Sequence, residues 1–137
     1  MRPLSTLDTD IVGYLIRGHD AKLENRFRSI LPSSISVSAV VSAELAYGLR
    51  SLPRSHRLQA DVPFFLSTIR VLAWDERCGE FYADIRHNLT RSGQLIGELD
   101  MMIAAHALAL GAILVTNNTR HYQRIPLPLK IENWVML

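Results

Sequence analysis

The sequence is poor in the residues that would suit a secreted or membrane environment. Its 137 residues include a single cysteine, Cys78, which excludes an internal disulfide and a four-cysteine zinc site, so the reducing cytoplasm is the expected compartment. The longest apolar stretch, Met101 to Val115, is interrupted by His106 and Gly111 and is too short to span a bilayer. No basic and apolar leader opens the chain. Neither secretion nor a membrane partner is therefore expected.

Motifs of several common enzyme classes are also missing. The chain has no Gly-rich phosphate loop, no Gly-x-Ser-x-Gly elbow and no His-Glu-x-x-His, and its five histidines lack zinc-ligand spacing. Cys78 has no nearby base in the sequence, so an inert cysteine is expected in place of a catalytic thiol. His106, inside an apolar segment, is interpreted as a hydrogen-bonded core or interface histidine.

The composition is that of a folded protein with nearly balanced charge. Apolar residues make up 48% and charged residues 20%, which argues against disorder. The length predicts one domain over residues 1–137. The net charge of +2 predicts local basic rims and not a strongly basic surface.

Short apolar strands alternate with helices along the chain. Strands are predicted at residues 4–7, 35–38, 69–74, 112–116 and 129–134, and those at 69–74 and 112–116 are expected to be buried. Helices are predicted at 10–18, 21–29, 39–51, 56–68, 76–92 and 98–110, with Asp75 as a cap, Pro63 as a kink or break, and a turn at 117–118. This alternation predicts an α/β fold with a short, mostly parallel sheet flanked by helices. Ligands of such sheets bind beyond the carboxyl ends of the strands, where Asp8 and the turn at 117–118 are expected.

Three acidic residues stand in apolar surroundings. Asp8 follows the first predicted strand, Glu44 lies inside an apolar helix, and Asp100 precedes the most apolar stretch. Carboxylates that converge repel one another unless a cation lies between them, and oxygen ligands suit Mg²⁺ or Mn²⁺. Each residue also has a simpler interpretation, since Asp8 could cap the next helix and Asp100 lies in a first helical turn, where a carboxylate is favoured.

Four blocks of sequence resemble a known family. Residues 7–11 (LDTDI), 42–48 (SAELAYG), 96–107 (IGELDMMIAAHA) and 115–122 (VTNNTRHY) are similar in order and spacing to the PIN-domain ribonucleases of VapC toxins. The resemblance implies a Rossmann-like, three-layer PIN fold and an endoribonuclease that depends on Mg²⁺ or Mn²⁺. By position it makes Asp8, Glu44 and Asp100 the catalytic and metal-binding acids and adds Asn118 as a catalytic residue. The supporting residues that it implies are Thr9, Asp10, Glu98, Thr116 and Asn117.

Two positions depart from the family pattern. The family usually has Asn where this chain has Asp10, and Pro where it has Glu98. Both changes add negative charge near the expected site, which could strengthen metal binding or repel RNA. They leave open an alternative function, a catalytically weakened PIN-like protein that acts mainly by binding an antitoxin and repressing operator DNA.

The resemblance also implies partners. It predicts a cytoplasmic toxin that forms a homodimer, is neutralised by a VapB antitoxin, contacts operator DNA only through that antitoxin, and cuts structured RNA, with the anticodon loop of initiator tRNA as the leading substrate. Arginine forks bind phosphate oxygens, and the candidate RNA contacts are Arg17, Arg50 and Arg120, with Arg54, Arg57 and Arg124 as further members. The same arginines also fit an ordinary solvated surface.

Overall fold

The computed structural model describes residues 2–135, so the predicted domain of 1–137 extends at both ends beyond the described residues. The strands are β1 (Ser5–Leu7), β2 (Ile35–Ser38), β3 (Arg70–Leu72), β4 (Ile113–Val115) and β5 (Lys130–Glu132). The helices are α1 (Thr9–Arg17), α2 (Ala21–Arg28), α3 (Ala39–Arg50), α4 (Leu58–Ser67), α5 (Glu76–Ser92), α6 (Glu98–Leu110) and α7 (Thr119–Tyr122), with a 3₁₀ turn at Pro32–Ser34. The predicted α/β class is confirmed.

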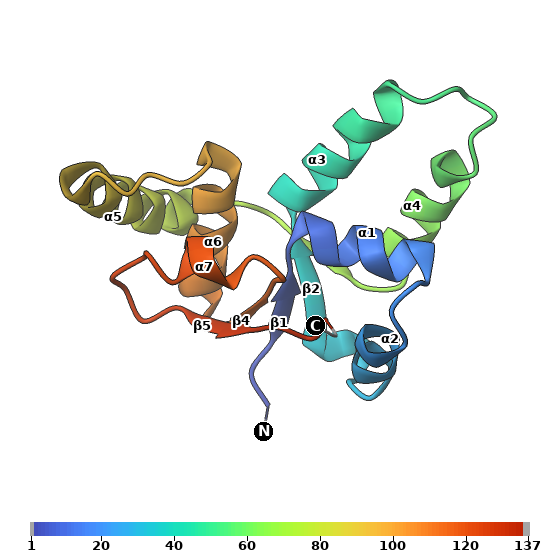
Figure 1. The fold of residues 1–137 in the computed structure, drawn as a ribbon, viewed down its shortest axis with the longest axis horizontal. Helices are drawn as coiled ribbons and strands as arrows, with labels where there is room; N and C mark the ends of the chain where they lie inside the picture. The colour runs from blue at the N-terminus through green and yellow to red at the C-terminus, as the bar shows by residue number, and fades with distance from the viewer. Residues whose placement is uncertain (1, 136–137) are drawn as a thin grey trace.

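The five strands form one parallel sheet in the order β3-β2-β1-β4-β5. The chain moves outward from β1 to β3 and then crosses back to β4 and β5. Right-handed crossovers place α1 to α4 on one face and α5 to α7 on the other, and Figure 1 shows α5 and α6 across the sheet from α1, α3 and α4. The direction of winding reverses between β1 and β4, and such a reversal opens a crevice beyond the carboxyl ends of the strands.

The register of the two central strands brings the residues after them together. Leu7 of β1 pairs with Val115 of β4, and the backbone N–H of Asp8 donates to the Val115 carbonyl at 3.0 Å. Asp8 and Thr116 therefore lie side by side at the crevice. Apolar side chains from both helical layers and from the strands pack beneath them into one continuous core.

Helix boundaries follow recognisable end signals. Asp8, Asp20, Ser38 and Asp75 each accept a backbone N–H in the first turn of the helix that follows. The expectation that Asp8 caps a helix is thus confirmed, with Ile11 as its backbone donor at 3.0 Å. Capping and metal binding do not exclude each other, because a carboxylate has further lone pairs on both oxygens.

Two buried residues behave as the sequence predicted. His106 of α6 is 2% exposed, and its Nδ1 lies 2.7 Å from the Oγ of Ser38 at the end of β2. Cys78 is 1% exposed, and burial raises the pKa of its thiol, so it carries little thiolate at neutral pH. Both are core residues.

The structure corrects three expectations about elements. The strand predicted to be buried at 69–74 is the short β3, in which Arg70 and Val71 are exposed, because β3 is the edge strand and has a neighbour on one side only. Helix α4 runs through Pro63 without being divided. A short helix, α7, follows directly after the turn at 117–118, where no helix was predicted.

No helix within residues 2–135 combines the length and the apolar character needed to cross a bilayer.

Candidate active site

Asp8 is the most deeply buried acid of the site. It is 5% exposed, its Oδ1 accepts the Ile11 N–H, and its Oδ2 accepts the Thr116 hydroxyl at 2.5 Å. Burial raises the pKa of Asp8 to about 6; the two hydrogen bonds oppose this rise, and the charges of Asp10 and Asp100 add to it. The carboxylate is therefore costly to ionise where it stands unless a positive charge approaches.

Asp100 enters the site from the opposite helical layer, in the first turn of α6. Its Oδ1 accepts the Tyr122 hydroxyl at 3.2 Å, and its Oδ2 lies 3.8 Å from His121 Nδ1. Burial, followed by the charges of Asp100, Asp8 and Glu44, raises the pKa of the Tyr122 hydroxyl, which remains a hydrogen-bond donor. All three acids therefore act on one buried hydroxyl and share one electrostatic environment.

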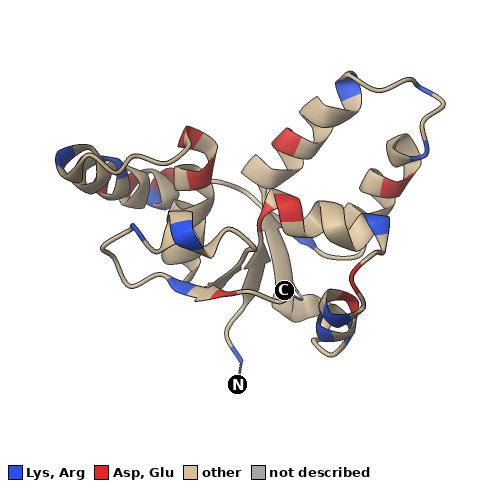
Figure 2. Ribbon diagram, viewed as in Figure 1, with Lys and Arg blue, Asp and Glu red and all other residues tan. Residues whose placement is uncertain are grey.

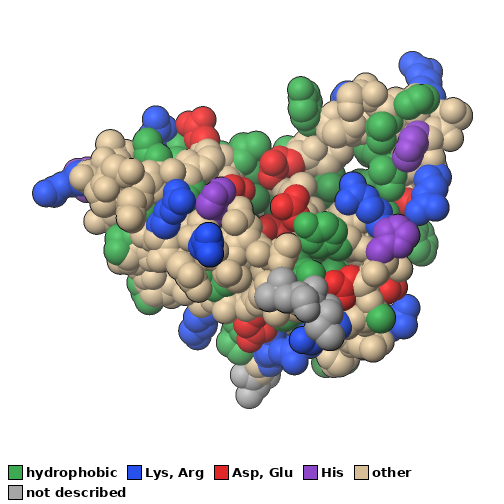
Figure 3. All heavy atoms as spheres, viewed as in Figure 1, with side chains coloured by type: hydrophobic (Ala, Val, Ile, Leu, Met, Phe, Trp, Pro, Cys, Tyr) green, Lys and Arg blue, Asp and Glu red, His purple; other side chains and the backbone are tan. Residues whose placement is uncertain are grey.

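Glu44 completes the acidic group from α3. Its Oε1 accepts the hydroxyl of Thr9 at 2.7 Å, and Thr9 is the residue that follows Asp8. Figure 2 shows acidic positions at the start of α1, on α3 and at the start of α6 around the centre of the molecule, with most basic positions further out. Figure 3 shows acidic side chains where the surface is hollowed between the two helical layers.

The turn after β4 supplies neutral polar groups. The Oγ1 of Thr116, which donates to Asp8, also accepts the backbone N–H of Asn118 at 2.9 Å. The side-chain nitrogen of Asn118 lies 2.8 Å from His121 Nδ1, and Asn117 Oδ1 accepts the Asn133 amide at 3.2 Å. Thr116 is thus bonded directly to Asp8 and Asn118 is linked to it through Thr116, whereas Asn117 is bonded to Asn133.

The donor set fits a hard divalent cation, although it is not a ready-made cage. Within residues 2–135, no three side chains of His, Cys, Asp or Glu lie close enough together to hold a metal ion. Mg²⁺, however, is usually bound through one or two carboxylates, with water and substrate phosphate as its remaining ligands. Asp100 and the buried Asp8 are carboxylates of this kind. In the absence of a cation, the charge of Asp100 raises the pKa of Asp8, and the charges of both acids raise the pKa of Tyr122.

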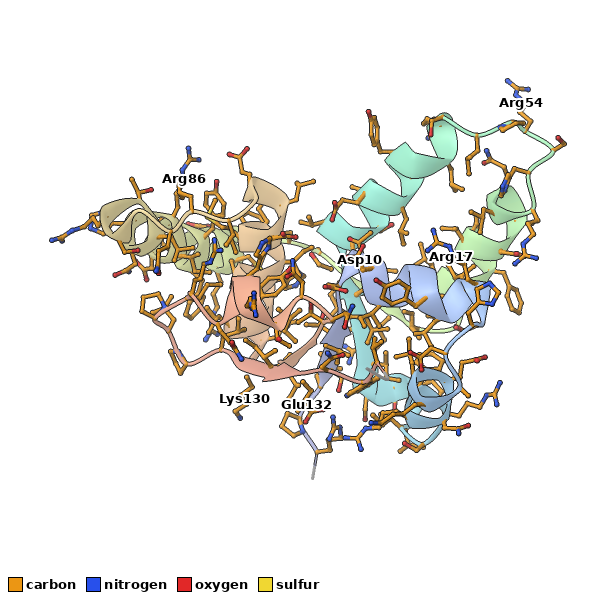
Figure 4. The ribbon with its side chains drawn as sticks, in the orientation of Figure 1. Asp10, Arg17, Arg54, Arg86, Lys130 and Glu132 are labelled. Carbon is orange, nitrogen blue, oxygen red and sulfur yellow. The ribbon has the colours of Figure 1, made fainter. Side chains whose placement is uncertain are left out.

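The two departures from the family pattern have different surroundings. Glu98 Oε1 lies 3.1 Å from Arg86 Nη1 and accepts the Tyr82 hydroxyl at 3.2 Å, so its charge is paired across α5 and α6. Asp10 is exposed, has no ion-pair partner within residues 2–135, and raises the pKa of Asp8. Figure 4 shows Arg86 on α5 and Asp10 at the start of α1. Only Asp10 adds unpaired negative charge to the site.

The candidate RNA-binding arginines are all exposed and spread widely. Arg57 lies 3.6 Å from Asp61, and Arg54 stands at the tip of the α3–α4 loop, far from Asp10 in Figure 4. Arg17, at the end of α1, makes no hydrogen bond or ion pair within residues 2–135. The remaining members of this group reach backbone carbonyls or solvent: Arg50, Arg120 and Arg124.

Sequence reasoning missed three residues that contact the site. His121 and Tyr122 reach Asp100 from α7, and Asn133 holds Asn117. The spacing of Asn118 and His121, three residues apart, would have indicated their contact if the short helix had been recognised. No local spacing indicates that Asn133 bonds Asn117, which lies 16 residues earlier.

Comparisons with known proteins agree with this fold. Residues 6–126 match the model of the PIN domain. The chain is 36% identical over 129 residues to "Ribonuclease VapC2" of Rickettsia felis, covering 93% of this chain and 96% of the relative. It is also 36% identical over 128 residues to the "tRNA(fMet)-specific endonuclease VapC" of Shigella flexneri, with the same two coverages.

A solved structure of VapBC2 from Rickettsia felis, bound to a DNA fragment from the promoter, is similar with a TM-score of 0.87 and 34% identity, over 96% of this chain and 98% of that chain. These matches extend over nearly the full length of both partners in each comparison. The chain therefore belongs to the PIN-domain family and, within it, to the VapC ribonucleases.

Proposed function

We propose that the protein is the toxin of a VapBC pair, an endoribonuclease that depends on Mg²⁺ or Mn²⁺. The observation that carries this proposal is the buried carboxyl of Asp8 at the crevice between β1 and β4, with its raised pKa and with Asp100 and Glu44 in the same electrostatic environment. A cation at this place would turn an unfavourable buried charge into a metal ligand.

The residues divide into ligands and supports. Asp8 and Asp100 would hold the ion directly, and Glu44 would hold it through water. When bound, such an ion polarises the scissile phosphate and lowers the pKa of its water. Hydroxyl donors orient the three carboxylates, and Asn118 contributes a neutral amide for water or phosphate. His121 keeps that amide in place through its Nδ1 contact.

The expected substrate and partners follow from the relatives. The Shigella flexneri relative is named as specific for tRNA(fMet), so we take structured tRNA, with initiator tRNA first, as the substrate. The Rickettsia felis structure is of a VapBC2 complex on promoter DNA, so we take a VapB antitoxin as partner and contact with operator DNA through it. A homodimer in the cytoplasm, with residues 1–137 acting as one PIN domain, completes the proposal.

The alternative of a catalytically weakened protein loses part of its basis. It depended on extra negative charge at two positions, and Glu98 is paired with Arg86 and Tyr82. Asp10 remains, at the exposed start of α1. The alternative therefore depends on a single exposed carboxylate, whose charge raises the pKa of Asp8.

Incubation of the purified protein with total tRNA tests the proposed function. We expect cleavage with Mg²⁺ or Mn²⁺, none with EDTA, and none by Asp100→Asn or Glu44→Gln, each with an unchanged circular dichroism spectrum. Asp84→Asn, at an exposed position on α5, is the matched control and should cleave like the wild type. Cleavage that continues in EDTA, or in Asp100→Asn, would contradict the metal assignment. Absence of any Mg²⁺-dependent cut would favour the binding role.

A further inference from the structure

We propose that a pocket beside the acids, between α1 and the turn after β4, holds one nucleoside of the substrate RNA next to the scissile phosphate. This inference rests on the proposed function and names the part of the site that grips the RNA chain. The pocket has a volume of about 270 Å³ and is lined by Tyr14, Arg17, His19, Asp20, Asn117 and Val135.

The pocket adjoins the catalytic centre through both of its walls. One wall is α1, which Asp8 caps, and Tyr14 lies six residues further on, about 9 Å along the helix axis. The other wall begins at Asn117, directly after the Thr116 whose hydroxyl bonds Asp8. On the face shown in Figure 3, basic and histidine side chains lie beside hydrophobic ones on this side of the acids. A nucleotide next to a phosphate held at Asp8 would reach this pocket.

Arg17 supplies an unpaired cation at the rim. It is exposed and makes no hydrogen bond or ion pair within residues 2–135. Its Nη1 lies 3.9 Å from the position that a Cβ on Gly13 would take, so the guanidinium lies back along α1, one turn before Arg17. An unpaired guanidinium in this position is suited to a phosphate oxygen of the RNA chain.

Tyr14 and Asn117 supply what a base needs. The Tyr14 ring is half-buried against the core, which fixes its plane, and its hydroxyl has no partner within residues 2–135. Asn117 is oriented by the Asn133 amide bonded to its Oδ1, which leaves its own N–H groups to donate. Unstacked RNA bases are recognised by an aromatic face together with hydrogen bonds to the base edge.

The charge of Asp20 indicates the direction of the nucleotide. Asp20 lines the pocket and accepts the Leu23 N–H at 2.9 Å as the cap of α2. A phosphate beside this carboxylate would be repelled. The phosphate therefore belongs at Arg17 and the nucleoside between Tyr14 and Asn117.

Kinetics on tRNA test the pocket directly. In Tyr14→Leu, which keeps an apolar side chain but removes the ring, we expect KM to rise about 5- to 150-fold with kcat unchanged, because stacking contributes to binding before the reaction. In Arg17→Gln we expect a higher KM and a salt dependence of binding whose log–log slope is smaller by about 0.7. Arg91→Gln, with the same charge change at the far end of α5, is the control and should leave both quantities unchanged.

A readout without catalysis separates this proposal from the function on which it rests. With tRNA containing 4-thiouridine in EDTA, we expect photocrosslinks in the tryptic peptide that ends at Arg17, and their loss in Tyr14→Leu. Crosslinks there from a protein that cuts no RNA would contradict the proposed function but support the pocket. Normal cleavage with unchanged KM in both variants would overturn the pocket alone.

If Tyr14→Leu fails to fold, the exposed Arg17→Gln still decides. Unchanged tRNA kinetics with weakened antitoxin binding would assign the pocket to a protein partner and also overturn the proposal.

Discussion

The buried carboxyl of Asp8 predicts that the metal-free protein becomes less stable as the pH rises. Below pH 3.8, the ordinary pKa, the group is protonated in the folded and the unfolded chain and contributes nothing. Between pH 3.8 and about 6 the unfolded chain releases the proton while the folded chain keeps it, so the free energy of unfolding falls. Above about pH 6 the penalty is complete. Asp8→Asn removes the ionisation and should therefore stabilise the metal-free protein at neutral pH.

The size of the effect follows from the same two pKa values. The difference between 3.8 and about 6 corresponds to about 3 kcal/mol. In the wild type the Thr116 hydroxyl donates to the Asp8 carboxylate. The Asn side chain of the variant keeps an oxygen for the Ile11 N–H but presents an N–H donor to Thr116, and the loss of the Thr116 hydrogen bond costs about 1 kcal/mol. We expect Asp8→Asn to be more stable than the wild type by roughly 1–2 kcal/mol at pH 8 in EDTA, or roughly 3–8 °C in Tm.

Urea unfolding in EDTA from pH 3.5 to 8 measures this difference. The advantage of Asp8→Asn should reach its full size above about pH 6 and should turn into a disadvantage of about 1 kcal/mol at the acid end of the range, where only the lost Thr116 bond remains. Mg²⁺ at 100 times its Kd should add about 2.7 kcal/mol to the wild type and little to the variant. Asp84→Asn controls for the loss of an exposed charge. A wild type that gains stability over Asp8→Asn as the pH rises in EDTA would refute the reasoning.

Three further predictions concern the supports of the site. Thr116→Val removes a donor to Asp8 and an acceptor for a backbone N–H, so the free energy of unfolding should fall by about 1–3 kcal/mol, and the pH midpoint of the stability profile should move above 6. Burial lowers the pKa of His106, so the contribution of this group to the free energy of unfolding should fall as the pH falls below 6.5. His106→Gln lacks this contribution, so urea unfolding should show the stability of the variant rising relative to the wild type toward low pH. Arg86→Ala should leave the Tm almost unchanged, because the ion pair of Arg86 with Glu98 is exposed. The same change should slow tRNA cleavage, because it leaves the negative charge of Glu98 unpaired near the acids. The double variant with Glu98→Gln should cleave at the wild-type rate. A slowed rate that the second change does not restore would show that Arg86 does not act through the charge of Glu98, and an unchanged rate in Arg86→Ala would show that this pair has no influence on the site.

The elements that carry the acids could be predicted from the sequence because local signals determine them. A strand that ends at Leu7, a cap at Asp8 and an apolar helix that begins before Asp100 all depend on residues close to one another along the chain. The parallel sheet follows from the alternation of these elements. The order β3-β2-β1-β4-β5 then places Asp8 at the reversal point, and the local pattern does not determine this order.

What could not be predicted depends on contacts between distant residues. The segment around β3 has the apolar pattern of a buried strand. Arg70 and Val71 are exposed because β3 lies at the edge of the sheet, a position that the local sequence does not indicate. The charge of Glu98 looked unpaired because its partners, Arg86 and Tyr82, lie 12 and 16 residues earlier on another helix. Tyr122 gave no signal of its role, since its contact with Asp100 exists only after α7 folds against α6.

The three acids have one feature in common that explains why the site suits a metal. Each is oriented by a neutral hydroxyl: Thr9 donates to Glu44, Thr116 to Asp8 and Tyr122 to Asp100. A hydroxyl fixes a carboxylate oxygen in space but leaves its negative charge uncompensated, whereas an arginine or lysine would neutralise it. Within residues 2–135, neither an arginine nor a lysine forms an ion pair with any of the three. The fold thus holds oriented negative charge in a partly buried crevice, and a divalent cation together with the phosphate of an RNA chain would complete it.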